Sequence, residues 1–457
     1  MIDTIMKLIK EKDFQRLKPL LKQLNPSDIA EILSDISKED LPVLFRLLPK
    51  DVAAEAFVEM DSNTEEILIK SFSDIELKLI LDELFVDDTI DLIEEMPANV
   101  AIRILQQSDK ETRESINQIL RYPKDSAGSI MTTECISLRP QMTVEQCFDK
   151  IRSQALDKET VYTCYVTDDF KKLLGIVTIK ELLLTDKKRP ICEIMEDNPI
   201  FVTTSTDKED VANTLLKYNF LALPVVDAEN RLLGIVTVDD AMDVLKDEAT
   251  EDISKMAAII PNGDKPYLQT NIWRICLSRI PWLLILMVSA TFTGMIISKN
   301  EKALNMKTIG IILTACIPML MDTGGNAGSQ AAVTVIRGIA LNEVHFKDIF
   351  KVLWKELRIS IILGAILSVA CFGKLMIIDE LWKNGTLGYI IAAVVCFSLW
   401  VTVIIAKLIG CVLPLVAKAC KLDPAVVASP CITTIVDAVS LSVYCYIAVT
   451  VLIPLVQ

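Results

Sequence analysis

The sequence predicts a multidomain membrane protein with an acidic soluble half and an all-α membrane half. Residues 1–270 carry 32 Lys and Arg against 52 Asp and Glu, whereas residues 271–457 carry 15 against 9. The second half also contains several apolar stretches near the ~20 residues that span hydrocarbon. We expect four parts: an all-α superhelical domain over residues 1–125, two α/β units over 126–246 (126–190 and 191–246), a connecting helix over 247–277 and five membrane helices over 278–457.

Residues 3–120 are predicted to be entirely helical. Apolar residues recur there with helical periodicity, and prolines at Pro26, Pro42, Pro49 and Pro97 interrupt the pattern at short intervals. Short helical hairpins that stack on their neighbours follow from this spacing. The many acids of this segment make it a poor partner for nucleic acid, because phosphate would be repelled.

An internal repeat follows the helical part. Leu174-Gly175-Ile-Val-Thr178 recurs as Leu233-Gly234-Ile-Val-Thr237, with the two glycines 59 residues apart. Each copy alternates short β-rich runs with amphipathic helices, which predicts a pair of small α/β units. The pair resembles tandem CBS domains, modules that often sense nucleotides or ions.

Five membrane spans can be drawn from the apolar stretches. They are Pro281–Ser298, Thr308–Ile336 with a Gly-rich break, Ile359–Ile378, Asn384–Ala406 and Pro424–Leu455. The loop between the second and third spans is the most basic, so the positive-inside rule places it, with the acidic half, in the cytoplasm. An odd number of spans then puts the C-terminus outside.

Two carboxylates stand alone in these apolar stretches. Asp322 is the only ionisable residue from Thr308 to Ile336, and Asp437 is the only one from Pro424 onward. An unpaired carboxylate at bilayer depth costs roughly 2.5–3.5 kcal/mol on insertion scales, so it normally faces water, a partner or an ion. The two acids therefore predict a path for a cation.

The second span concentrates unusual residues around Asp322. Pro318 and three glycines make helix weak there, so we expect backbone carbonyls freed to line a wet cavity with Asp322, Asn326 and Gln330. Close helix packing through small residues is the alternative explanation of the glycines.

The last span has a related pattern around Asp437. Thr433 and Asp437 are four residues apart, which places hydroxyl and carboxylate on one helical face, and Pro430 is expected to interrupt the helix just before them. Carboxylates from two subunits would suit a hydrated Mg²⁺, which keeps several waters. Mn²⁺, Co²⁺ and Ni²⁺ stay open, although the single His345 argues against an imidazole-built site.

Taken together, these segments resemble the MgtE family of Mg²⁺ transporters over essentially the whole chain. The resemblance rests on the acidic helical domain, the entry Tyr122–Met131 into the CBS pair, the Asp322–Gln330 segment and the Asp423-Pro424 start of the last span. It implies a homodimeric, Mg²⁺-selective channel in the cell membrane, with its pore between the subunits and no enzymatic activity. It further implies that Asp437 and Thr433 hold hydrated Mg²⁺, that Asp322, Gly325 and Asn326 line the cavity, and that Asp423 lies near the cytoplasmic mouth.

The same resemblance implies regulation by cytosolic Mg²⁺. The implied regulatory ligands are Asp87 and Asp91 in the helical domain, Asp207, Glu209, Asp240 and Asp243 in the second CBS unit, and Glu248, Glu251 and Asp252 in the connecting "plug" helix. Their like charges would repel one another without Mg²⁺ and favour an open state, whereas bound ions would favour a closed one. Asn219 departs from the Asp that relatives often carry, which puts one bridging site in doubt.

Nucleotide binding is a further implication. Some relatives bind ATP beside a basic–acidic pair after the Gly-x-Val-Thr strand; the corresponding pair here is Lys180-Glu181 in place of Arg-Asp. The departure leaves ATP as an open expectation.

Two other functional classes remain in competition. A Na⁺- or H⁺-coupled divalent-cation transporter would use the same two acids, and its reversal potential would shift with Na⁺ or pH. An intramembrane aspartyl protease also has two acids in separate spans, but its second acid usually follows Gly-x-Gly, whereas Asp437 follows Thr-Ile-Val. Cleavage of a model membrane substrate would support the protease.

Overall fold

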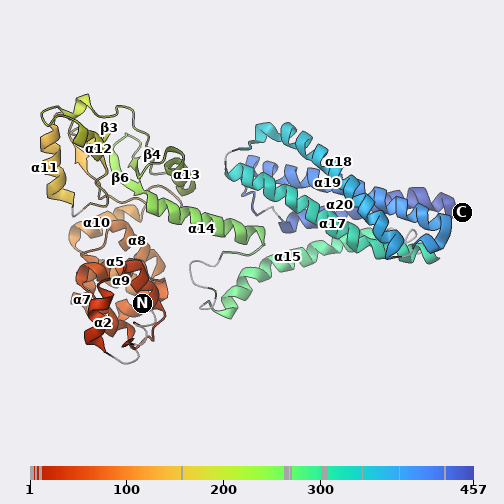
Figure 1. The fold of residues 1–457 in the computed structure, drawn as a ribbon, viewed down its shortest axis with the longest axis horizontal. Coiled ribbons are helices and arrows are strands. Elements are labelled where there is room, and N and C mark those ends of the chain that lie inside the picture. The colour runs from red at the N-terminus through yellow and green to blue at the C-terminus, as the bar shows by residue number, and fades with distance from the viewer. Residues whose placement is uncertain are drawn as a thin grey trace. The chain divides into compact units, whose positions relative to one another are not determined.

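The described part of the computed structural model forms two compact units (Figure 1). The described residues are 5, 8–9, 13–155, 158–261, 267, 270–299, 307–341, 343–379, 381–426 and 429–456. Unit 1 comprises Met1–Glu248 with Asp264–Tyr267, and unit 2 comprises Ala249–Gly263 with Leu268–Gln457. Each unit is described by itself.

Unit 1 begins with a series of short helices, as the sequence predicts. They are α2 (Phe14–Leu21), α3 (Pro26–Ser34), α4 (Leu41–Phe45), α5 (Lys50–Val58), α6 (Ser62–Ser71), α7 (Asp74–Leu81), α8 (Val86–Glu95), α9 (Ala98–Gln107) and α10 (Lys110–Ile119). Pro26 and Pro42 lie in the first turns of their helices, where a missing N–H costs nothing. Side-chain caps from Asp61, Ser73 and Asp109 begin three further helices.

These helices pack on one another in an alternating order. α3 contacts α5, α5 contacts α7 and α7 contacts α9, while α4 contacts α6 and α6 contacts α9. Phe45, Phe57 and Phe72 meet in their core, with ring centroids 5.4–6.4 Å apart. The arrangement confirms the stacked helical domain.

The second part of unit 1 contains two three-stranded sheets with the same topology. The first unit has β1 (Ser137–Leu138), α11 (Val144–Gln154), β2 (Thr163–Thr167), β3 (Leu173–Thr178), α12 (Ile179–Leu184) and the 3₁₀ turn η2 (Ile191–Glu193). The second has β4 (Val202–Thr203), α13 (Lys208–Tyr218), β5 (Ala222–Val226), β6 (Leu232–Thr237) and α14 (Val238–Met256). In each sheet the first strand pairs parallel to the second, which pairs antiparallel to the third.

The repeated glycines allow the two α/β units to exchange backbone contacts. Thr132, from before β1, exchanges two hydrogen bonds of 2.8 Å with Ile235 of β6, and Glu196 bonds Ile176 of β3 in the same way. A Cβ on Gly234 would lie 2.3 Å from the Thr132 carbonyl oxygen. Only glycine therefore permits this approach, which explains the Leu-Gly-Ile-Val-Thr repeat in physical terms.

Unit 2 is built from long helices. They are α15 (Ile272–Lys299), α17 (Lys307–Ala340), α18 (Ile349–Ile377), α19 (Gly385–Ala419) and α20 (Ser429–Val456), with 3₁₀ turns η3 (Phe346–Asp348) and η4 (Leu381–Asn384). Figure 1 shows α17, α18, α19 and α20 running alongside one another; α19 packs against the other three, and α15 packs chiefly on α20. Tyr444 of α20 donates a 2.9 Å hydrogen bond to the Leu313 carbonyl of α17 inside this bundle.

Four segments of the described residues are long and apolar enough to cross a membrane. They are Ile272–Lys299, Phe346–Ile377, Gly388–Ala419 and Cys431–Leu452. The fifth long helix, α17, has the required length but carries Asp322, Asn326 and Gln330 within its central turns. The predicted second span is thus a long helix of more polar composition than the other four.

Two predictions about helix breaks are wrong. α17 runs without interruption from Lys307 to Ala340 through Pro318 and the glycines, and α20 begins at Ser429, so that Pro430 lies in its first turn. The backbone carbonyls of the Asp322 segment are therefore helical instead of freed as cation ligands. The glycines serve close helix packing, which is the alternative explanation raised above.

The predicted single connecting helix over 247–277 is also wrong. α14 ends at Met256 and α15 begins at Ile272. Ala258 has a left-handed φ of 56°, and the N–H groups of Ala258 and Ile259 bond back to Lys255 and Ser254. This is a Schellman ending, which stops a helix by satisfying its last carbonyls. The predicted position of Pro266 within a helix lies outside the described residues.

Candidate functional site

The contact between α17 and α20 brings predicted pore residues together. A Cβ placed on Gly325 would lie 3.3 Å from the Thr433 methyl carbon and 3.7 Å from an Asp437 carboxylate oxygen. Gly324 and Gly328 face Val436 on the same side of α20. Small residues on α17 therefore let the Thr433–Asp437 face of α20 approach closely.

A polar stripe runs along an exposed side of α17. Asp322, Asn326 and Gln330 are spaced four residues apart and are all exposed in the chain by itself, while Gly324, Gly325 and Gly328 on the other side are buried. Asp437 is half-buried on the adjoining helix, and the Asp322 and Asp437 carboxylates are close enough to repel each other. The pair of helices thus presents two acids and two amides at one edge of the bundle.

Asp423 follows α19 and contacts the end of α14 within unit 2. The Lys255 ammonium lies 2.7 Å from an Asp423 oxygen and 2.8 Å from a Glu251 oxygen. Burial lowers the pKa of Lys255, but the hydrogen bonds to both carboxylates outweigh it and raise the pKa overall. Burial, and then the nearby Asp423, raise the pKa of Asp252. The structure therefore brings together three of the predicted ligands, with a lysine among them that the sequence argument did not consider.

A second group of acids lies in unit 1, where α8 faces the start of α14. Asp87 and Asp91 are on α8 and interact electrostatically with Asp240, whose carboxylate also accepts a hydrogen bond from the Thr237 hydroxyl. Burial and then Asp240 raise the pKa of Asp91 to about 7. The same causes in the same order raise the pKa of Asp87 well above its usual range. These shifts reflect acids held together without a counter-ion.

Three acids of this group were missed by the sequence argument. They are Asp88, Glu134 and Glu159. Burial raises the pKa of Asp88 to about 6 and that of Glu159 to about 8, with neighbouring carboxylates adding to each shift. Asp88 could have been suspected from its position beside Asp87. Glu134 and Glu159 lie in separate loops, and only the tertiary fold brings them to α8.

The remaining predicted regulatory acids are dispersed over unit 1. Asp207 accepts a 2.9 Å hydrogen bond from the Glu209 N–H at the start of α13. Glu248 lies 3.5 Å from the Lys208 ammonium, and the exposed Asp243 pairs with Lys246 at 3.6 Å. Glu209 is half-buried in the first turn of α13. In this structure Lys208, between Asp125 and Glu248, occupies the place of a counter-ion.

Asn219 and the Lys180-Glu181 pair have structural roles. Asn219 ends α13 with a left-handed φ of 54°, a conformation that Asn tolerates better than most residues. Glu181 closes a capping box at α12 by accepting from the Thr178 N–H at 2.7 Å, while Lys180 is exposed. The glutamate is thus occupied as a helix cap.

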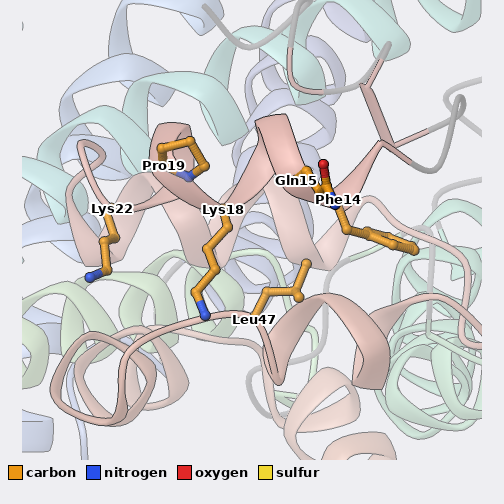
Figure 2. A pocket seen from close by; sticks show the side chains of 6 residues that line it. All are labelled: Phe14, Gln15, Lys18, Pro19, Lys22 and Leu47. Atoms are coloured by element: carbon orange, nitrogen blue, oxygen red, sulfur yellow. The ribbon is translucent and has the colours of Figure 1, made fainter.

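Two hollows lie away from the acids. One is in unit 1 and measures about 540 Å³; Figure 2 shows its lining of Phe14, Gln15, Lys18, Pro19, Lys22 and Leu47. The other is in unit 2, measures about 930 Å³ and lies between the end of α15 and the Thr434–Val439 part of α20. Both are mainly apolar, so neither resembles a cation site.

Comparison with known proteins supports this domain plan. Residues 24–125 match the model of the MgtE intracellular N domain, residues 127–187 and 191–247 match the CBS domain, and residues 317–447 match the divalent cation transporter MgtE. The magnesium transporter MgtE of Thermus thermophilus is 34% identical over 97% of both chains, and that of Bacillus subtilis is 30% identical over 97% of this chain and 96% of its own.

Solved structures resemble the soluble part. The cytosolic domain of the Mg²⁺ channel MgtE in complex with ATP is 34% identical, covers 53% of this chain and 100% of its own, and has a TM-score of 0.51. The soluble part of a magnesium transporter is 29% identical, covers 54% of this chain and 98% of its own, and has the same TM-score. With near-full-length relatives and all its domains matched in order, the chain belongs to the MgtE family of magnesium transporters.

Proposed function

We propose that two copies of this chain form a Mg²⁺-selective channel, with the ion path lined by α17 and α20. The observation that carries the proposal is the exposed stripe of Asp322, Asn326 and Gln330 beside the half-buried Asp437. Such a stripe is costly against hydrocarbon, so a second copy and a water-filled path are the natural cover for it. A homodimer would also bring two Asp437 carboxylates to one hydrated ion.

The glycine contact explains how this path would keep its shape. Thr433 and Asp437 lie against Gly325, where a larger residue would push α20 away from α17. Asp437 and Thr433 would bind the hydrated ion, Asp322, Gly325 and Asn326 would line the approach, and Asp423 would lie near the cytoplasmic mouth. Mg²⁺ suits this role because it keeps water while binding one or two carboxylates.

Closure by cytosolic Mg²⁺ is the second part of the proposal. The acids on α8 and at the start of α14 are buried together, and the Glu251, Asp252 and Asp423 group forms another cluster. Divalent ions would relieve the repulsion in both clusters and favour a closed state. The dispersed acids Asp207, Glu209, Asp243 and Glu248 would join only if the lysines that contact two of them move.

The membrane and nucleotide assignments belong to the same proposal. The chain would lie in the cell membrane with unit 1 cytoplasmic and the C-terminus outside, since the segment after α17 carries Lys347, Lys351, Lys355 and Arg358. ATP would bind the CBS pair, because a relative's cytosolic domain 34% identical to this chain is described in complex with ATP.

The test is Mg²⁺ flux through the full-length protein in liposomes. Asp437→Asn should lower Mg²⁺ flux by at least tenfold, because it removes the charge that holds the ion, and it should leave the dimer intact. Asp348→Asn, which changes an exposed acid paired with Lys351 outside the path, is the matched control. Wild-type flux in Asp437→Asn would contradict the proposed path.

Electrical recording separates a channel from a coupled transporter. A channel should reverse at the potential set by the Mg²⁺ gradient alone. A reversal potential that moves with Na⁺ or pH at constant Mg²⁺ would instead assign coupled transport to the same two acids.

A further inference from the structure

The acids Asp87, Glu134 and Glu159 meet at one place in unit 1. One carboxylate oxygen from each lies within 4.8 Å of the other two. Asp87 is in the first turn of α8, Glu134 lies in the loop before β1, and Glu159 lies in the loop between α11 and β2. The cluster therefore joins the helical domain to two loops of the first CBS unit.

Two of these carboxylates have buried oxygens without a protein partner. Among the described residues, Asp87 Oδ1 and Glu159 Oε2 are shielded from solvent and accept no hydrogen bond, and no lysine or arginine pairs with either side chain. A buried charge without a partner is among the costliest arrangements in a folded protein. These two oxygens thus point to a missing positive ligand.

Glu134 is held in the cluster by its surroundings. One of its oxygens accepts hydrogen bonds from the Val86 N–H at 3.2 Å and from the Thr132 hydroxyl at 3.3 Å. The Glu159 N–H donates a 3.1 Å hydrogen bond to the Glu134 carbonyl, which ties the two loops together. The backbone thus holds the loop of Glu134 beside the first turn of α8 and beside Glu159, before any ion arrives.

The chemistry of the cluster selects the class of ligand. All three donors are carboxylate oxygens, and hard divalent cations such as Mg²⁺, Ca²⁺ and Mn²⁺ prefer such donors. Asp88 and Asp240 add negative charge nearby, because both raise the pKa of Glu159. A monovalent ion would leave most of this charge unbalanced.

We propose that Asp87, Glu134 and Glu159 form a divalent-cation site that fastens the helical domain to the first CBS unit. Asp87 is one of the acids already expected to bind regulatory Mg²⁺, and the new element is the pair of glutamates from the first CBS unit. The inference deepens the regulation proposed above and rests on it only for the identity of the physiological ion. Binding of the ion would fix α8 against both loops, and its loss would release them.

The test counts bound Mn²⁺ on the purified full-length protein by electron paramagnetic resonance, with Mn²⁺ as the probe for Mg²⁺. The double variant Glu134→Gln and Glu159→Gln should lose one site or bind it at least tenfold more weakly, because two of its three charged ligands become neutral amides. Asp197→Asn, an exposed acid of the same soluble part, is the matched control. An unchanged number of sites with unchanged affinity in the double variant would overturn the proposal.

Folding and transport are separated by two further measurements. Without divalent ions the double variant should unfold at the same or a higher temperature than wild type, since it lacks buried repulsion; a lower temperature would indicate a merely structural role. Added Mg²⁺ should slow amide exchange in the first turn of α8 in the wild type and leave it unchanged in the variant. Asp437→Asn should keep the Mn²⁺ site, so a failed transport proposal would not remove this one.

Discussion

Glycine at the helix contacts of unit 2 shows how single residues set the geometry of the membrane part. A Cβ on Gly410 of α19 would lie 2.2 Å from the Gly328 carbonyl oxygen of α17, whereas a Cβ on Gly373 of α18 would meet nothing within 4 Å. Backbone atoms cannot move aside as a flexible side chain can. The distance between α17 and α19 therefore depends on the absence of one methyl group.

Gly410→Ala should destabilise unit 2 by about 1–3 kcal/mol, the usual cost of overpacking. Gly373→Ala should be neutral or stabilising, since alanine is the better helix former by up to about 1 kcal/mol. Thermal unfolding followed by tryptophan fluorescence measures both, because all five tryptophans lie between residues 273 and 400. Equal stability of the two variants would mean that α17 and α19 separate without cost.

A buried acid in the helical domain gives a residue-scale test in pH. Glu65 of α6 is only 6% exposed; burial and then Glu95 and Asp61 raise its pKa to about 9. An acid with a raised pKa holds its proton longer in the folded state than in the unfolded state. Its contribution to stability is therefore present below its ordinary pKa and is lost as pH rises toward 9.

We expect Glu65→Gln to remove part of the loss of stability between pH 7 and pH 9, since the amide keeps the shape and cannot ionise. Glu59→Gln, at an exposed position on the same domain, is the control. Amide exchange in α6 and α8 at several pH values provides the measurement. The same pH dependence in wild type and Glu65→Gln would assign the loss to other groups.

The residues that sequence reasoning found and missed differ in a physical way. Gly325, Thr433 and Asp437 stand out because glycine, hydroxyl and charge are rare in apolar helices, and the structure places them in contact. Glu134 and Glu159 stand out in nothing, because loops of a soluble acidic domain are expected to carry glutamates. Their pairing depends on the tertiary fold of unit 1, which no local pattern records.

At the scale of elements, the end of α14 illustrates how a helix boundary was misplaced. The charged residues after Asp247 favour helix, and the prediction therefore continued it to Leu277. The actual signals are Lys255 in the last turn and Pro261 soon after the end, with Ala258 in a conformation that usually belongs to glycine. Because alanine there gives no sequence signal of its own, the ending could not be read with certainty.

Ala258→Gly should stabilise the end of α14 by about 1 kcal/mol, because it relieves the left-handed strain of an L-residue. Slower amide exchange at Ile259, whose N–H bonds to the Ser254 carbonyl at 2.9 Å, would be the local readout. Ala257→Gly, one residue earlier, should not stabilise, since that residue lacks a positive φ. Faster exchange in Ala258→Gly would show that this ending is not strained.

The helices of unit 2 show the opposite error. Pro318 and the glycines of α17 suggested a break, yet the helix continues because its neighbours pack closely against those glycines. Local helix propensity is weak compared with such packing. A composition that weakens an isolated helix can therefore strengthen a contact inside a bundle.

At the scale of the whole molecule, the order of domains was predictable from the sequence and is confirmed. Short helices, a repeated α/β unit and long apolar helices each leave a periodic signal, and each appears in the predicted order. The pore and regulatory roles of individual acids remain predictions, since they depend on ions and on a second copy.

The uneven charge of the chain leads to the last prediction. Residues 1–270 carry a net charge of −20 and the rest +6, so unit 1 experiences strong self-repulsion that ions should relieve. NaCl screens charges everywhere, and its effect should be spread over unit 1. Mg²⁺ at the same ionic strength should add protection only where carboxylates converge, on α8 and at the start of α14, because a divalent ion can bridge them.

Amide exchange of the full-length protein in NaCl and in MgCl₂ of matched ionic strength distinguishes these effects. Protection by Mg²⁺ should exceed that by NaCl at Asp87–Asp91 and around Asp240, and should equal it in α2 to α5, which carry many charges without a buried acidic cluster. Equal protection throughout unit 1 would mean that Mg²⁺ acts only by screening. The cytosolic acids would then respond to ionic strength instead of to the ion that the channel carries, and closure by Mg²⁺ would need another cause.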